Sequence, residues 1–417
     1  MRDDSEPGLL SVPCLGWSLL FFLSITTFSC FVASVPFIQV EWSLTNTEAS
    51  IVFSSYLIGY AISALVYVPL SDRFRPGFMF LAGVAGICIP NLLFPIVAED
   101  AWTGSGLRAL AGAGQALAYT TGMRLVASRF TARRGTAVSV FIALAYLGST
   151  LSYVLMGQLL DMWQDWRSAY FALAVFSSLS IVLTGVLLLA LRQYPEPSKP
   201  LSNTTTGRLQ PALLRDASIA KLIAAYAIHT ADLYVVRMWL PLLLGSALVF
   251  HGTAPGAAAA QASTLAGLMF ILGAGSVLAG GWLSDNWDRR KGAVLILGLS
   301  AAVSGTIGWL TGEPLYYIVG AGFLLGLLTA ADSAIYSTAL IEMAPEGRIG
   351  AVQALQSFVG FTAGAVMPVI AGWLIDLVDG PGKWGIAFTF NALLSVAALV
   401  FMASLRSEDK TRTATES

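Results

Sequence analysis

Five ionisable residues lie inside long apolar stretches of this chain, and they are the residues best placed to do chemistry there. They are Arg108, His229, Asp232, Arg237 and Asp332. A charge near the centre of a bilayer costs at least about 2.5–3.5 kcal/mol, so each side chain should face a partner or a water-filled cavity. Two arginines and a histidine favour an anionic ligand. The aspartates are the candidate proton carriers, because apolar surroundings favour the protonated form of a carboxylate.

Hydrogen-bonding residues share helix faces with these charges. At about 100° per residue, Gln115 and Tyr119 fall on the stripe that carries Arg108. Tyr336 lies one helical turn beyond Asp332 on another stripe. We therefore predict the following substrate-binding or coupling residues: Arg108, Gln115, Tyr119, His229, Asp232, Arg237, Asp332 and Tyr336.

The same charges have a structural alternative. Asp232 and Arg237 could pair with each other and fix one helix in place. Asp232 could instead neutralise Arg108 across the interface between two domains. Both alternatives remain open from the sequence.

Twelve apolar stretches position these residues, each close to the roughly 20 residues that a helix needs to cross a bilayer. We expect an all-α polytopic membrane protein with twelve transmembrane helices in two pseudo-symmetric six-helix bundles. The bundles are residues 1–191 and 218–417, joined by a polar cytoplasmic linker at 192–217. The expected spans are 15–40, 49–70, 77–98, 103–127, 136–160, 168–191, 218–246, 259–284, 292–312, 315–341, 350–374 and 385–404.

The composition excludes a soluble protein. Hydrophobic residues make up 56% of the 417 residues, charged residues make up 11%, and the mean hydropathy is +0.73. A soluble domain carries about 25% charged residues. Cys14, Cys30 and Cys88 lack the spacing of a disulfide or zinc site, and we expect no metal and no cofactor.

Lysine and arginine residues are concentrated at one end of the predicted membrane spans. All but four of the 23 Lys and Arg residues lie at a terminus, in an even-numbered connection or within a turn of one. Arg167 and Lys383 lie in odd-numbered connections, and Arg108 and Arg237 lie inside spans. Positive loop residues stay in the cytoplasm, so we expect both termini there and place the protein in a bacterial inner membrane.

The two halves of the chain repeat each other. The corresponding segments are LSDRFRPG (70–77) and LSDNWDRR (283–290), GQLLD (157–161) and GWLID (372–376), and WRSAYF (166–171) and WGIAF (384–388). Each half has an even number of spans, so both halves enter the membrane from the same side. Parallel repeats of this kind are typical of two-halved secondary carriers.

Together these features resemble the major facilitator superfamily over nearly the whole chain. The loop motif of that family is G-x-L-[AS]-D-R-x-G-R-[RK]. Its two copies here include Leu70, Ser71, Asp72 and Arg73, and then Gly281, Leu283, Ser284, Asp285 and Arg289. The first copy departs from the motif, with Val68 at the leading glycine and Arg75 at the second glycine. The resemblance implies that the gating residues are Asp72, Arg73, Gly281, Asp285 and Arg289.

A second motif of the family, R-x-x-x-G-x-G, is matched in the fourth span by Arg108, Gly112 and Gly114. The resemblance implies that spans one, four, seven and ten line a central cavity. The run AIHTADLYVVRMWLPLLL (227–244) also resembles the cyanate- and nitrate-permease branch.

The sequence favours a secondary carrier that moves a small anionic solute by alternating access, with a proton as the candidate coupling ion. The alternative is a proton-driven efflux carrier for amphipathic or cationic compounds, which Asp232 and Asp332 would attract. An enzyme is disfavoured, because the chain has no HExxH, GxSxG or Walker A motif. We expect the carrier to act as a monomer in the lipid bilayer, with no nucleic-acid partner.

Overall fold

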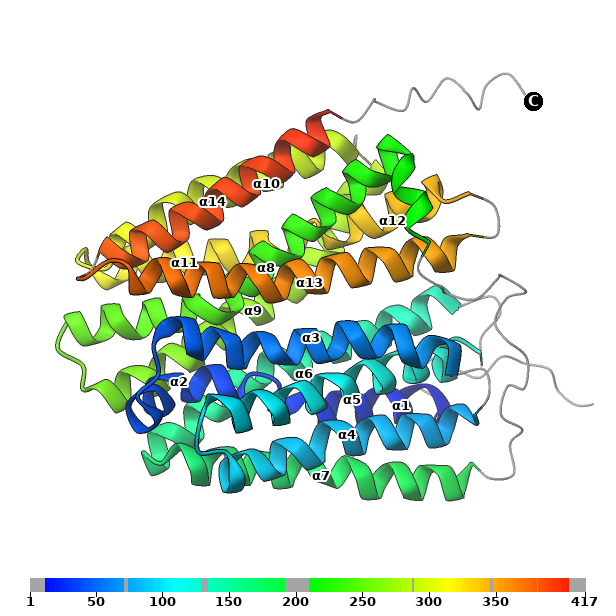
Figure 1. The fold of residues 1–417 in the computed structure, drawn as a ribbon, viewed down its shortest axis with the longest axis horizontal. Coiled ribbons are helices and arrows are strands. Elements are labelled where there is room, and N and C mark those ends of the chain that lie inside the picture. The colour runs from blue at the N-terminus through cyan, green and yellow to red at the C-terminus, as the bar shows by residue number, and fades with distance from the viewer. Residues whose placement is uncertain are drawn as a thin grey trace, which may run out of the picture.

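The computed structural model describes residues 12–70, 74–128, 134–191, 210–286, 289–345, 348–380 and 382–404. The described residues form helices joined by short turns (Figure 1). The elements are α1 Val12–Ser24, η1 Ile25–Thr27, α2 Cys30–Trp42, α3 Asn46–Leu70, α4 Pro76–Val97, α5 Ala101–Ala127, α6 Arg134–Trp163, α7 Trp166–Ala190, η2 Pro211–Arg215, α8 Ala217–Phe250, α9 Pro255–Asn286, α10 Arg289–Ile307, η3 Gly308–Leu310, α11 Leu315–Ala331, α12 Ser333–Met343, α13 Ile349–Asp376 and α14 Gly382–Ala403.

Ten helical stretches among the described residues are long and apolar enough to cross a membrane. The fourth predicted span, 103–127, lies in the 27-residue helix α5, which is long enough but is not one of the ten. Arg108, Gln115 and many glycines lower its hydropathy. The tenth predicted span, 315–341, contains the shorter apolar helix α11.

The predicted continuous span 15–40 is broken in the structure. A single 3-10 turn, Ile25–Thr27, separates α1 from α2. The hydroxyls of Ser24 and Thr26 each donate to a carbonyl three residues earlier, at 2.8 Å, and such bonds compete with the helical ladder. The Ser29 N–H donates to Ser152 Oγ of α6 at 2.8 Å, so a neighbouring helix satisfies a donor that the break releases.

The predicted span 315–341 is also broken, at Asp332. This residue ends α11 with φ −90° and ψ −5°, and α12 begins at Ser333. The Tyr336 hydroxyl donates to Asp332 Oδ2 at 2.8 Å, which holds the carboxylate inside the break. One of the predicted site residues therefore lies where the helix is interrupted.

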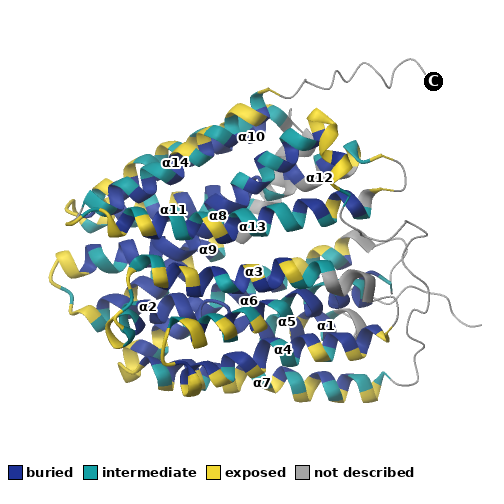
Figure 2. Cartoon of the chain, viewed as in Figure 1, coloured by how far each residue is buried: buried dark blue, intermediate teal, exposed yellow. Residues whose placement is uncertain are grey.

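Helices α1–α7 lie together in Figure 1, and helices α8–α14 lie together above them. We call these groups the amino-terminal half and the carboxy-terminal half. They meet where α3 packs on α13 and α6 packs on α9. Figure 2 shows buried residues along these helices interspersed with intermediate and exposed ones. Apolar side chains on the far surfaces are exposed, for example Val182 and Leu189 of α7, as expected of a surface that faces lipid.

Glycines let α5 approach its neighbours closely. A Cβ placed at Gly112 would lie 1.9 Å from the Tyr56 carbonyl oxygen of α3, and one at Gly59 would lie 2.0 Å from the Ala109 carbonyl oxygen. A Cβ at Gly114 would lie 2.2 Å from the backbone of α4. The motif glycines of α5 are therefore helix-crossing points, and these crossings fix the helix that carries Arg108.

Candidate functional site

Arg108 is buried on α5, 1% exposed, against the broken first span. Its guanidinium lies 4.5 Å from the centre of the Tyr56 ring and 5.5 Å from that of Phe31. Nη1 donates to the Phe28 carbonyl oxygen at 3.3 Å, whereas Nε and Nη2 have no hydrogen-bond partner. Aromatic rings thus provide most of the surroundings of this cation.

Arg237 extends from α8 into the amino-terminal half. Its guanidinium lies 4.9 Å from the centre of the Tyr146 ring, 5.7 Å from that of Phe28 and 5.9 Å from that of Phe270. Nη1 is 3.4 Å from Ser149 Oγ of α6, and Nε has no hydrogen-bond partner. This arginine too is held by rings and hydroxyls.

The two arginines converge on Phe28, directly after the break in the first span. The Phe28 carbonyl accepts a hydrogen bond from Arg108, and its ring faces Arg237. The Phe28 ring also packs edge-on against Tyr56 at 5.1 Å, so the ring that Arg237 faces contacts the ring that Arg108 faces. The described residues provide neither arginine with an ion pair. A buried cation of this kind is costly unless a ligand supplies the opposite charge.

The other predicted residues of α5 lie beside this site. Gln115 Oε1 accepts a hydrogen bond from the Tyr56 hydroxyl at 2.5 Å, which fixes the ring that stacks on Arg108. Tyr119 packs its ring against Phe21 and Phe141 at 5.8 and 5.7 Å. Gln115 therefore orients a ring at the arginine, whereas Tyr119 packs within an aromatic cluster.

A second polar cluster forms around His229 in the carboxy-terminal half. His229 Nδ1 lies 2.8 Å from Asp332 Oδ1, and its Nε2 lies 2.9 Å from the Ser333 hydroxyl. Tyr336 donates to the other carboxylate oxygen of Asp332. The side chains of His229 and Asp332 are 4% and 2% exposed. We call these four residues the His229 cluster; it joins α8 to the break between α11 and α12.

Asp232 turns away from both arginines. Its carboxylate accepts a hydrogen bond from Asn391 Nδ2 of α14, and Asn391 also donates to Ser304 Oγ of α10 at 3.2 Å. The structure thus shows neither of the alternative ion pairs, Asp232 with Arg237 or Asp232 with Arg108. Asp232 reaches α14, whereas Arg237 reaches α6.

Sequence reasoning missed several partners of these charges. Phe28 contacts both Arg108 and Arg237, whereas Ser149 contacts Arg237 and Asn391 contacts Asp232. Asn391 is an amide within an apolar run, and that signal could have identified it. Phe28 gave no signal, because an aromatic residue in an apolar stretch of sequence is ordinary.

The structure describes only some of the predicted gating residues, and of those only the backbone. Asp72 and Arg73 lie outside the described residues. The backbone positions of Gly281 and Asp285 fall in α9, and that of Arg289 begins α10, but their side chains lie outside the described part. Among the described residues, no group of three or more His, Cys, Asp or Glu side chains could hold a metal ion.

Comparison with known proteins supports the class that the fold indicates. The family model of the Major Facilitator Superfamily matches residues 17–253 and 243–417. The glycerol-3-phosphate transporter of Bacillus subtilis is 22% identical over 402 residues, covering 89% of this chain and 87% of that protein. The hexuronate transporter of the same organism is 24% identical over 402 residues, covering 88% and 87%.

Solved structures share the fold. The nucleoside transporter NupG superposes with a TM-score of 0.75 at 14% identity, covering 94% of this chain and 100% of that one. A bacterial homologue of the human lysosomal transporter Spinster, in an inward-facing and unoccupied conformation, gives 0.71 at 14% identity and covers 96% of both chains.

The fold and the matched family define an all-helical membrane transporter. The chain belongs to the major facilitator superfamily, whose members carry small solutes across membranes.

Proposed function

We propose that this protein is a secondary carrier that moves a small organic anion by alternating access between its two halves. The observation that carries the proposal is the convergence of Arg108 and Arg237 on Phe28 without an ion pair. Two relatives that match over most of their length are named for glycerol 3-phosphate and hexuronates, which are organic anions. The resemblance of residues 227–244 to cyanate and nitrate permeases does not support this proposal. The two relatives described above are named as transporters of other solutes.

An anionic group would bind by accepting hydrogen bonds from the unpartnered nitrogens. Arg108 offers Nε and Nη2, and Arg237 offers Nε. A guanidinium presents its donors as a planar fork, which suits carboxylate and phosphate oxygens. Arg108 faces the Tyr56 ring, Arg237 faces the Phe28 ring, and the two rings pack together, so we expect a ligand that binds both arginines to displace Phe28.

Uptake by proteoliposomes tests this function directly. Glycerol 3-phosphate and glucuronate would be compared with glycerol and glucose, which match them in shape and lack their charge. We expect uptake of at least one anion that exceeds uptake of its neutral analogue tenfold or more. Equal uptake of anion and neutral analogue would overturn the anionic assignment and leave the carrier activity intact.

The His229 cluster is the proposed site of proton coupling. Asp332 contacts a base, a phenol and, through His229, the Ser333 hydroxyl, so a proton that enters the cluster has several acceptors. Asp332→Asn should abolish the stimulation of uptake by an inward proton gradient while exchange of substrate for substrate continues. Asp232→Asn is the matched variant and should keep at least part of the stimulation. A gradient response that survives Asp332→Asn would move coupling elsewhere.

The two halves are proposed to close against each other at the outer end. We use this term for the end that holds the connections 43–45, 98–100, 164–165, 251–254 and 377–380, which the charge pattern places away from the cytoplasm. There Asp376 of α13 accepts from Asn46 N at 3.0 Å and from Thr47 N at 2.8 Å, the first residues of α3. A carboxylate at a helix N-terminus is stabilised by the unpaired N–H groups and the helix dipole.

Asp376→Ala should loosen this closure. Ser50 of α3 is fully buried, and a Cβ on Gly372 of α13 would lie 2.6 Å from its hydroxyl. With Ser50→Cys as the reporter, a membrane-impermeant maleimide should label the protein about tenfold faster when Asp376 is removed. Asp379→Ala removes an exposed carboxylate three residues away and should leave labelling unchanged. Equal rates in both variants would show that the Asp376 contacts do not hold the outer end.

The finer topology is part of the same proposal. We place twelve spans in two six-helix bundles, residues 1–191 and 218–417, with 192–217 as a cytoplasmic linker. Both termini are placed in the cytoplasm, and the membrane is a bacterial inner membrane. The protein acts as a monomer, and it carries its solute together with protons by symport. The residues Asp72, Arg73, Gly281, Asp285 and Arg289 remain the proposed gating residues.

Efflux of cationic compounds is the weaker proposal. Asp332 is bonded to His229 and Tyr336, and Asp232 is bonded to Asn391. Among the described buried residues, Arg108 and Arg237 have no ion pair, whereas both aspartates already have hydrogen-bond partners.

A further inference from the structure

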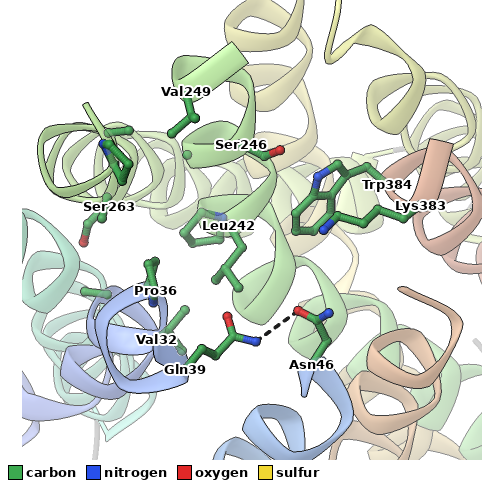
Figure 3. Close-up of a pocket in the computed structure, with 16 residues that line it drawn as sticks. Val32, Pro36, Gln39, Asn46, Leu242, Ser246, Val249, Ser263, Lys383 and Trp384 are labelled. Carbon is green, nitrogen blue, oxygen red and sulfur yellow. Dashed lines mark hydrogen bonds between the residues drawn. The ribbon is translucent and has the colours of Figure 1, made fainter. Parts of the chain in front are cut away.

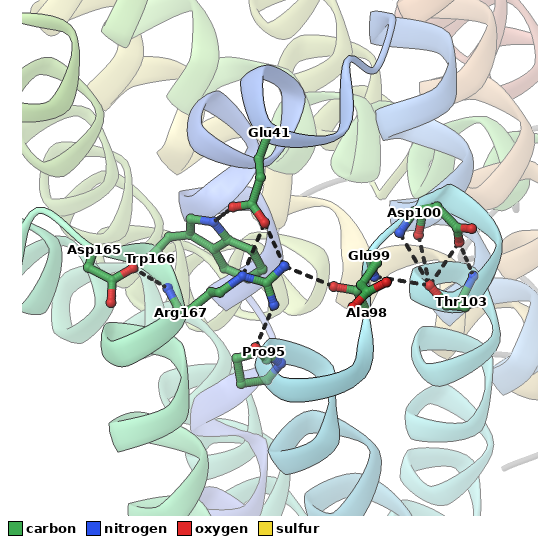
Figure 4. Close-up of polar contacts among 9 residues, drawn as sticks. All are labelled: Glu41, Pro95, Ala98, Glu99, Asp100, Thr103, Asp165, Trp166 and Arg167. Atoms are coloured by element: carbon green, nitrogen blue, oxygen red, sulfur yellow. Dashed lines mark hydrogen bonds and ion pairs between the residues drawn. The ribbon is translucent and has the colours of Figure 1, made fainter.

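Trp166 and Trp384 occupy corresponding positions in the two halves of the repeat, but only the indole N–H of Trp166 has a hydrogen-bond acceptor. Trp166, at the start of α7, donates Nε1–H to Glu41 Oε2 of α2 at 2.7 Å. Arg167 donates to the other oxygen of Glu41 at 2.5 and 3.1 Å, and also to the carbonyls of Pro95 and Ala98 at 2.6 and 3.1 Å. Figure 4 shows Trp166 and Arg167 both bonded to the Glu41 carboxylate.

Trp384, near the start of α14, has no such acceptor. Its side chain is buried, at 4% exposed, and its Nε1–H has no hydrogen-bond partner. An unpaired buried donor costs about 1–3 kcal/mol. Residues 240–284, which include the end of α8 where Glu41 would have its counterpart, contain no Asp or Glu. The carboxy-terminal half therefore keeps the donor and lacks the carboxylate.

A pocket of about 210 Å³, lined in part by Lys383 and Trp384, lies between the two halves at the outer end. Its walls come from α2, α3, α8, α9 and the start of α14, and most of them are apolar. Lys383 and Trp384 both extend toward α8 in Figure 3. Lys383 Nζ lies 5.5 Å from the centre of the Trp384 ring, so a second donor accompanies the indole.

Lys383 also stands out by its position in the sequence. Arg167 and Lys383 are the lysine and arginine residues of the odd-numbered connections. Glu41 neutralises Arg167. Lys383 is in none of the ion pairs formed among the described residues, and it lines the pocket. Among the described residues, Lys383 has no ion pair, and it lies next to Trp384, the tryptophan of the pair whose indole N–H has no acceptor.

We propose that this outer pocket binds the carboxylate of a small amphipathic organic acid. The carboxylate would accept hydrogen bonds from Trp384 Nε1 and Lys383 Nζ, in the role that Glu41 has in the other half. The hydrocarbon part would lie along Val32, Pro36 and Leu242. Neither Arg108 nor Arg237 lines the pocket, so the site is separate from the proposed substrate site.

The occupant would favour a closed outer end. Gln39 of α2 donates to Asn46 of α3 at 3.1 Å along one wall, and Asn46 is held by Asp376 of the other half. Opposite walls of the pocket belong to different halves, so separating the halves would dismantle the site. A ligand that binds only the closed state stabilises that state by mass action.

Binding of radiolabelled octanoate to the protein in lipid nanodiscs tests the proposal, with octanol and octylamine as competitors. We expect saturable binding that excess octanoate displaces and that equal concentrations of octanol or octylamine do not. Trp384→Phe keeps the ring and removes the N–H, and Lys383→Gln removes the charge; each should weaken binding about tenfold. Trp102→Phe alters a tryptophan that is 87% exposed and should change nothing.

The outcomes separate this site from the carrier function. Arg237→Gln should leave octanoate binding unchanged even if it stops transport. The proposal fails if octanoate shows only the non-saturable partition of octanol, or if both pocket variants bind as the parent protein does. Because Lys383 is partly exposed, Lys383→Gln remains informative even if Trp384→Phe folds poorly.

Discussion

Arg108→Gln and Arg237→Gln are each expected to lower the initial rate of anion uptake about 100-fold. Removing one partner of a buried, hydrogen-bonded charge pair costs about 2–5 kcal/mol, and a factor of 100 corresponds to about 2.7 kcal/mol. Glutamine keeps much of the length and polarity of arginine but loses the charge and the planar fork of donors. The measurement is uptake of the best substrate by proteoliposomes, normalised to the amount of folded protein.

Thermal stability distinguishes binding from a structural role. Each arginine is buried without an ion pair among the described residues, so its removal should leave the melting temperature of the ligand-free protein unchanged or raise it. A structural ion pair would give the opposite result. Arg215→Gln replaces an exposed arginine of η2 and serves as the control for handling and reconstitution. Transport at parental rates by both variants would remove the basis of the anion proposal.

The sequence predicted where most of the helices lie because the length of an apolar run is a local property. It predicted the two breaks poorly. Serine and threonine around Thr26 barely lower the apolarity of the run, yet their hydroxyls compete for the backbone carbonyls that sustain the helix. The break at Asp332 depends on His229 and Tyr336, and His229 lies on a different span.

Partners of the buried charges were predictable only in part. Asp232 and Arg237 are five positions apart, which places them about 140° apart around a helix, so their pointing to different neighbours follows from spacing. The identity of those neighbours does not. Asn391 meets Asp232 only because α14 packs on α8, and Phe28 meets both arginines only because the first span is broken beside them.

The second large effect is expected on stability, at a glycine that has no functional side chain. Gly112→Ala should lower the free energy of unfolding by at least about 3 kcal/mol, the upper part of the usual range for overpacking. The new Cβ would lie 1.9 Å from the Tyr56 carbonyl oxygen, a backbone atom that cannot rotate away. Relief requires α3 and α5 to separate along a crossing that Gly59 and Ala109 also share. The measurement is thermal unfolding of the purified protein, together with its yield as a single species.

Gly106→Ala on the same helix is the matched control. A Cβ there meets nothing within 4 Å, so the added methyl should be neutral or slightly stabilising. The comparison isolates the crossing, because both changes add one methyl to a helical glycine of α5. The same shift would also move the Tyr56 ring that stacks on Arg108, so any folded Gly112→Ala protein should transport more slowly than its stability alone explains. Equal stability of the two variants would mean that the helices do not approach at Gly112 as closely as the structure shows.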